Sequence, residues 1–178
     1  GCAEDPQYTK EEIPHLDSLL LRGIESTYDL KFEEAQSDLS QLLLESNSRQ
    51  STKYQVLANL NLGNLYHHFN LDEEALKYFF QSLELSENSD QKHLLNAIYN
   101  NIGIIYAKNK AFAEAEQYFR LALQISRDQN LTSKEGMNLI NLGIVLGSMG
   151  NEAEAVDFLN QSLEIFKDLN DSTHFGTI

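Results

Sequence analysis

The chain has 178 residues, of which 42% are hydrophobic and 22% are charged, a composition ordinary for a folded protein. Thirteen basic against twenty-seven acidic residues give a formal net charge of -14, and such a surface repels nucleic-acid phosphates and anionic membranes. Charge therefore argues against nucleic acid as a partner of this segment and permits a protein or peptide. The single cysteine excludes an intramolecular disulfide.

The N-terminal residues 1–15 form a polar segment that begins with Gly1, Cys2 and Ala3. A glycine followed by a cysteine resembles the processing site of bacterial lipoproteins, where the signal peptide is removed and the cysteine is acylated. This resemblance implies that Cys2 is lipidated and that residues 1–15 tether an extracytoplasmic, membrane-anchored protein. In the other interpretation Gly1 remains from a purification tag, Cys2 is an ordinary residue and the protein is cytoplasmic.

The rest of the chain repeats every forty residues. Three columns define the repeat: a glycine, a glutamate eleven residues later and an alanine twelve residues later. The columns are Gly23, Gly63, Gly103 and Gly143; Glu34, Glu74, Glu114 and Glu154; Ala35, Ala75, Ala115 and Ala155. They predict four units, about residues 16–52, 53–92, 93–132 and 133–172, each with two amphipathic helices. Residues 173–178 would begin a fifth unit, so we expect the native chain to continue.

Taken in chain order, the first unit is degenerate, because Arg22 precedes its glycine. The second unit is expected to turn at Asn70 and the fourth at Gly150, residue types that accept the left-handed backbone of a tight turn. Asn109 and Lys110 interrupt the helical pattern of the third unit. The column glutamates fall in the first turn of each second helix, where negative charge favours the exposed amides. We expect about 70% or more helix and no strand, since no segment alternates with period two.

These columns resemble the tetratricopeptide repeat. The matching residues are Leu62, Gly63, Tyr66, Ala75, Phe79 and Ser82 in the second unit; Tyr99, Ile102, Gly103, Tyr106, Ala115, Phe119 and Ala122 in the third; Leu139, Leu142, Gly143, Leu146, Ala155, Leu159 and Ser162 in the fourth. The resemblance implies an all-α, right-handed α-solenoid of tandem helix-turn-helix hairpins. The family's usual repeat has about 34 residues, and its closing proline is replaced here by Asn47, Glu87, Arg127 and Lys167. Both departures suit the longer forty-residue variants found in peptide-binding regulators and motor adaptor chains.

The sequence offers no pattern typical of an enzyme. It has no glycine-rich phosphate loop, no metal-binding helix signature and no nucleophile elbow. The adjacent His67 and His68 would point about 100° apart on a helix and could not hold one metal together. We therefore predict no catalytic residue, no metal site and no cofactor.

The resemblance also implies a binding site, because in the family the first helices of successive repeats line a concave groove for a peptide. The position two residues before each glycine faces this groove, and three of its four members are asparagines, Asn61, Asn101 and Asn141. A carboxamide can pair with a peptide unit whatever the ligand's side chains. Alternatively, these asparagines bond only neighbouring helix backbone or water. The expected flanking residues are Asn64, His68, Asn100, Ile104, Lys108, Ile144 and Ser148.

The repeats that clamp an acidic chaperone tail carry Lys or Arg on this face. The corresponding positions here are not basic, so a carboxylate clamp is not expected: Leu57, Leu60, Ala97, Asn100, Met137 and Ile140. The favoured hypothesis is a non-catalytic scaffold that binds a peptide or protein in its concave groove. The alternative is a sensory, ligand-binding domain of a longer membrane-associated regulator, which the full-length sequence would distinguish. Both leave the identity of the ligand and the oligomeric state open.

Overall fold

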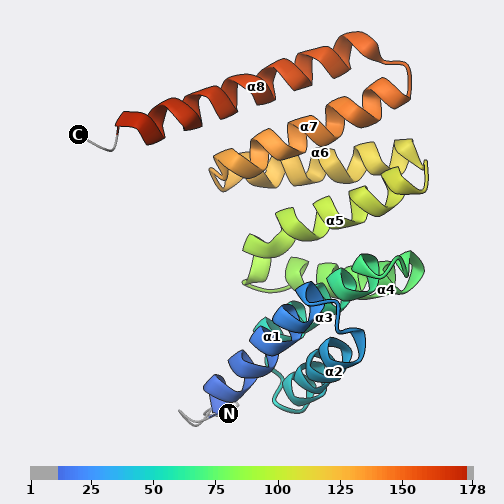
Figure 1. Cartoon of the computed structure of the whole chain (residues 1–178), viewed down its shortest axis with the longest axis vertical. Coiled ribbons are helices and arrows are strands. Elements are labelled where there is room, and N and C mark those ends of the chain that lie inside the picture. Colours follow the sequence, from blue (N-terminus) through green and yellow to red (C-terminus); the bar gives the residue numbers. More distant parts are fainter. Residues whose placement is uncertain (1–11, 176–178) are drawn as a thin grey trace. The chain divides into compact units, whose positions relative to one another are not determined.

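The computed structural model describes residues 12–175, in which helices account for 87% of the residues and no strand occurs. Eight α-helices and one short 3-10 helix follow one another along the described chain (Figure 1). Their bounds are α1 Glu12–Tyr28, α2 Phe32–Ser48, α3 Thr52–His68, α4 Asp72–Glu87, η1 Gln91–Leu94, α5 Leu95–Lys108, α6 Phe112–Asp128, α7 Thr132–Ser148 and α8 Glu152–Phe175.

The helices form hairpins within two compact units, residues 1–92 and 93–178. In unit 1, α1 packs on α2 and α3 on α4, while α2 and α1 also contact α3. In unit 2, α5 packs on α6 and α7 on α8, while α6 and α5 also contact α7. Each unit is therefore a pair of antiparallel helix hairpins joined through the second helix of the first hairpin, as the sequence predicts for tandem repeats.

The glycine and alanine columns mark where the two helices of a hairpin approach most closely. A Cβ atom added at Gly63 would lie 2.5 Å from the ring of Phe79, and one at Gly103 would lie 2.7 Å from the ring of Phe119. The column alanines are buried, with Ala115 wholly inaccessible to solvent. Small residues are thus required because a large apolar side chain of the partner helix occupies the space.

The same pair of backbone hydrogen bonds closes six of the turns between the described helices. At the end of α3 the Leu71 amide donates to the Tyr66 carbonyl at 2.9 Å, and the Asn70 amide donates to His67 at 2.9 Å. These two bonds are those of a Schellman motif, which satisfies the last carbonyls of a helix. Its left-handed residue has a positive φ, and the residues in this position are Leu30, Gln50, Asn70, Lys110, Asn130 and Gly150.

Asn70 and Gly150 were expected at turns, whereas a left-handed Leu30 was not. Leu30 has a φ of 61°, which costs a non-glycine residue about 1 kcal/mol. The two hydrogen bonds of the motif hold it there: Lys31 donates to Ser26 at 2.8 Å and Leu30 to Thr27 at 3.2 Å. The turn geometry therefore comes from the helix ends that meet there rather than from the preference of one residue.

The connection between α4 and α5 departs from this pattern. Asp90, forty residues after Gln50 and forty before Asn130, does not share their positive φ in the described backbone. The chain instead passes through the short helix η1 before α5 begins. The column glutamates do fall in the first turn of each second helix, as predicted, with Glu34, Glu74, Glu114 and Glu154 in those positions.

Helix α8 is longer than the other second helices and runs through Thr173 to Phe175. The sequence placed the start of a fifth unit at Thr173, so the described backbone has continuous helix where a new helix was expected. On α8, Val156 and Leu163 are 55% and 51% exposed. Leu123, which corresponds to Leu163 in α6, is only 5% exposed because α7 covers it.

Candidate functional site

The predicted site residues of unit 2 lie on the first helices of its two hairpins. Asn100, Asn101, Ile104 and Lys108 belong to α5, and Asn141, Ile144 and Ser148 belong to α7. The Asn141 Nδ2 donates to the Asn100 Oδ1 at 2.8 Å, so the structure brings these two residues together across the helix pair. Asn101 is partly buried on the same helix as Asn100.

Apolar side chains lie beside these carboxamides. Ile144 is 58% exposed and Met137 is 55% exposed, and both share a face of α7 with Asn141, because residues four and three apart are neighbours on a helix. Ile104 is less available, since it packs against the core cluster of α6 and α7. The Ser148 hydroxyl donates to the Ile144 carbonyl at 2.9 Å and stays exposed at the end of the helix.

In unit 1 the predicted residues lie on α3. The Asn61 Nδ2 donates to the Leu57 carbonyl of its own helix at 2.8 Å. Asn64 is partly buried, and His68 is exposed with its ring 5.9 Å from that of Phe69. The neighbouring His67 faces the turn instead, with its Nδ1 2.9 Å from an oxygen of Asp72. The Nδ2 groups of Asn61 and Asn141 thus have partners within their own units, while both residues remain partly accessible.

Two stacked pairs of tyrosines recur in the structure, and the repeat alignment predicted only one member of each pair. The rings of Tyr66 and Tyr78 stack at 5.3 Å, and forty residues later those of Tyr106 and Tyr118 stack at 5.5 Å. Tyr66 and Tyr106 were recognised as family positions, but their partners were not, although the forty-residue spacing of Tyr78 and Tyr118 was a usable signal. Burial raises the pKa of Tyr78, and its contact with Tyr66 adds to the effect.

Several charged groups on the described surface are held in pairs. The bond from Arg22 to Asp38 raises the pKa of Arg22, and bonds from Arg120, first to Glu154 and then to Glu116, raise that of Arg120. Burial, with the hydrogen bond to Asp17, raises the pKa of Tyr54 to about 12. The bond from Gln41 is the largest cause that lowers the pKa of Glu45. Each of these groups keeps its usual charge near neutral pH.

The part of the chain that the structure describes shows neither a cluster of metal ligands nor a membrane-spanning helix. No group of three or more His, Cys, Asp or Glu side chains is placed there to hold a metal ion. Within the same residues, none of the helices combines the length and the apolar character needed to cross a bilayer. Cys2, the predicted lipidation site, lies outside the described residues.

The hairpin geometry agrees with a family comparison. The sequence profile of the tetratricopeptide repeat matches residues 54–128 and, overlapping, 94–168. The chain belongs to the tetratricopeptide repeat family. The predicted family and the all-α fold of tandem tetratricopeptide hairpins are thus confirmed.

One solved structure with the same fold is described as the crystal structure of BtubC (BKLC) from P. vanneervenii. The two chains superpose with a TM-score of 0.79 over 93% of this chain and 68% of the other, at 19% sequence identity. At this identity the likeness shows the fold alone. No curated protein matches the sequence. Tetratricopeptide repeats generally mediate protein–protein interaction and are typically non-catalytic scaffolds.

Proposed function

We propose that this tetratricopeptide chain is a scaffold that binds a peptide or protein on the face formed by the first helices of its hairpins. The observation that carries the proposal is the α5–α7 face of unit 2, where exposed Met137 and Ile144 lie beside the bonded pair Asn100 and Asn141. Apolar side chains next to a few fixed polar groups are the usual composition of a binding surface.

The bond between Asn100 and Asn141 supports this proposal for an energetic reason. Ordering a side chain at an interface costs free energy, and a group that is already fixed before the ligand arrives avoids part of that cost. Carboxamides offer both donors and acceptors, so a pair fixed in this way can meet an extended peptide backbone regardless of its side chains. Ile144, half exposed one turn further along α7, would add apolar contact.

A photo-crosslinking experiment tests the face directly. A benzophenone amino acid placed at Ile144 should yield a discrete crosslinked species in extracts of the native organism. The same amino acid at Leu121 on the second helix α6 is the matched control, since Leu121 is also apolar and is 40% exposed. Equal crosslinking from both positions, or capture from Leu121 alone, would contradict the proposal.

We further propose that Cys2 is acylated and tethers the scaffold to a bacterial membrane outside the cytoplasm, which the Gly1–Cys2 sequence supports. A single acyl chain gives only marginal membrane binding, so stable anchoring requires more than one chain or a second contact. The native protein should therefore sediment with membranes, and Cys2→Ala should move it to the supernatant. Membrane association that survives the substitution would assign the attachment to another part of the protein.

A further inference from the structure

Unit 1 contains a cleft that is lined by none of the residues predicted for the groove. It lies between the second helices α2 and α4, which make no backbone contact with one another, and α3 forms its floor. The cleft has a volume of about 600 Å³. Carboxamides dominate its lining, and Glu84 is the one charged side chain among the residues that line it; the carboxamides are Asn47, Asn59, Gln81 and Asn88.

The floor of this cleft holds an acceptor that lacks a donor. Asn59 is only 3% exposed, and its Nδ2 donates to the Gln55 carbonyl at 2.8 Å. Its Oδ1 is buried and has no hydrogen-bond partner among the described residues. A buried acceptor without a donor costs about 1–3 kcal/mol. A ligand that brings an N–H group to this floor would recover part of that cost.

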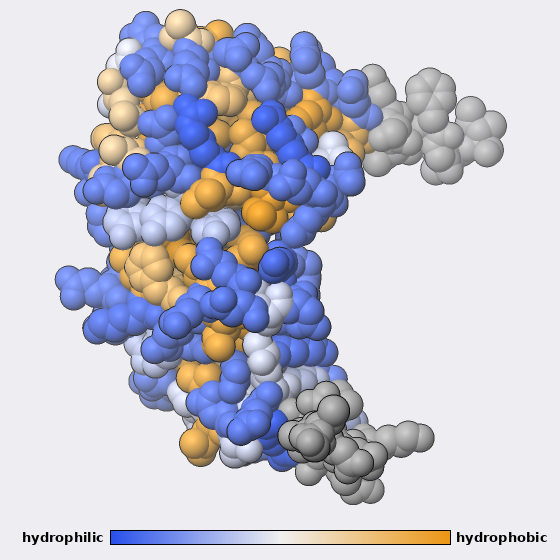
Figure 2. Space-filling view, turned by 180° about the vertical axis from the view of Figure 1, so that it is seen from behind, coloured by the Kyte–Doolittle hydropathy of each residue, from blue (hydrophilic) through white to orange (hydrophobic). Residues whose placement is uncertain are grey.

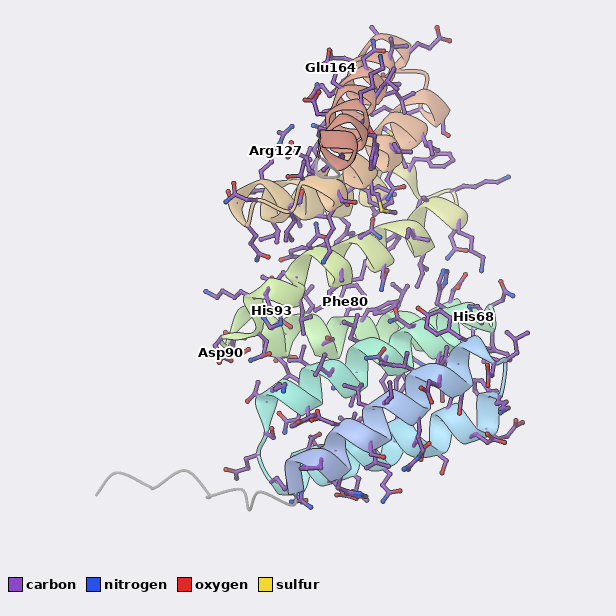
Figure 3. All side chains as sticks on the ribbon, turned by 60° about the vertical axis from the view of Figure 1, so that its left-hand side comes forward. His68, Phe80, Asp90, His93, Arg127 and Glu164 are labelled. Atoms are coloured by element: carbon purple, nitrogen blue, oxygen red, sulfur yellow. The ribbon has the colours of Figure 1, made fainter. Side chains whose placement is uncertain are left out.

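The second unit shows what fills the same place eighty residues later. There Arg127, which corresponds to Asn47, extends from the end of α6 across α7. Its Nε donates to Glu135 at 2.7 Å, and its Nη2 lies 3.5 Å from the Gln161 oxygen on α8. Figure 3 shows Arg127 on the side of unit 2 where α8 carries Glu164, the counterpart of Glu84. The groove of unit 2 is therefore occupied by a guanidinium group of its own chain.

Unit 1 lacks the guanidinium and keeps one of its two acceptors, because Gln81 corresponds to Gln161 whereas Gln55 replaces Glu135. Gln81 and Glu84 stand where unit 2 has Gln161 and Glu164, but the short Asn47 replaces Arg127. The floor residue also differs, because Asn59 with its unpaired oxygen takes the position of the wholly buried Leu139. Both changes open the groove and add an acceptor in unit 1.

We propose that the cleft of unit 1, formed by α2, α3 and α4, binds an arginine side chain of a partner polypeptide. A guanidinium is planar, carries five N–H donors and is more weakly hydrated than an ammonium, so it suits a lining of carboxamides and one carboxylate. The net charge of -14 also favours a basic partner. The site uses other helices than the α5–α7 face and does not depend on it.

A peptide titration of the whole chain tests the assignment. The probe is acetyl-Gly-Arg-Gly-amide, and the matched peptides carry lysine or the neutral arginine isostere citrulline. Nitrogen-15 spectra should show saturable shifts of the Asn59 and Gln81 side-chain amides with the arginine peptide. The citrulline peptide should bind about tenfold more weakly or worse, a loss of about 1.4 kcal/mol. Equal binding of both peptides, or no saturable shift at the cleft, would overturn the proposal.

Two variants give the cleft of unit 1 the side chains found at the corresponding positions of unit 2. The double substitution Asn47→Arg and Gln55→Glu reproduces Arg127 and Glu135, so the cleft should be filled from within and peptide binding should be lost. Asn59→Leu reproduces Leu139; it should bind about tenfold more weakly and still fold, because an apolar side chain replaces an unpaired buried acceptor. Ser37→Arg places an arginine elsewhere on α2, outside the cleft lining, and should bind as the original chain does. Undiminished binding by a folded Asn47→Arg, Gln55→Glu variant would refute the site.

Discussion

Replacement of Phe119 by alanine is expected to lower the free energy of unfolding by about 3–5 kcal/mol, the cost typical of removing a large buried aromatic side chain. Phe119 is 2% exposed and belongs to the core cluster that joins α6 to α7. Its ring also fills the space left by Gly103 on α5. The substitution should thus weaken both the α5–α6 hairpin and its contact with the next one.

The matched control for this prediction is two residues away on the same helix. Leu121 is 40% exposed, so Leu121→Ala removes little buried surface and should change stability by less than about 0.5 kcal/mol. Urea denaturation followed by circular dichroism would measure both variants through their midpoints. Similar midpoints for the two variants would mean that Phe119 does not occupy the core position that the repeat assigns to it.

The second large effect concerns binding. The double substitution Asn101→Ala and Asn141→Ala should weaken binding of the captured partner by about one to two powers of ten. Each hydrogen bond to a ligand backbone contributes about 0.5–1.5 kcal/mol, and 1.4 kcal/mol is a tenfold change. Asn141→Ala also removes the donor that holds Asn100, so part of the loss would come from a carboxamide that is no longer fixed.

The chain should still fold after these substitutions, because Asn100, Asn101 and Asn141 are only partly buried and water can replace the missing bonds. Asn160→Ala on the exposed surface of α8 is the control for loss of a carboxamide outside the face. Affinity would be measured by calorimetry with the partner captured from Ile144, alongside the melting temperature. Unchanged affinity in a folded double variant would show that the asparagines serve the helix pair and not the ligand.

Most of the fold could be predicted from the sequence because its main contacts are repeated. Gly63 and Gly103 recur with Phe79 and Phe119 at fixed spacing, and each pair lies at a close approach between two helices. The turn at Leu30 could not be predicted in this way, since leucine alone gives no sign of a left-handed backbone. Hydrogen bonds from two neighbouring amides hold it, and their geometry exists only once both helices have formed.

The binding surfaces were less predictable for a related reason. The pairing of Asn141 with Asn100, which belongs to another column of the repeat, depends on how far one helix is displaced along its neighbour. The cleft of unit 1 depends on which helices flank α3. The sequence difference that marks the cleft lies in one column of the repeat, where the family usually has a proline. This column contains Asn47, Glu87, Arg127 and Lys167. Two members of this column, Asn47 and Arg127, distinguish the cleft of unit 1 from the corresponding surface of unit 2.

Hydrophobic side chains on the described surface lie between hydrophilic ones in the view from behind (Figure 2).

The local backbone determines where residues can be inserted into the chain. Six turns use a fixed number of residues to close the same two hydrogen bonds, so an insertion at Leu30 or Asn130 would leave helix carbonyls unsatisfied.

The stretch from Ser89 to Leu94 has no left-handed residue to preserve. This makes it the natural place for a protein engineer to insert a protease site, a fluorescent label or extra residues. Recombination between genes of such arrays would likewise be tolerated best at this point, because repeats joined there need not share the forty-residue register of the other turns.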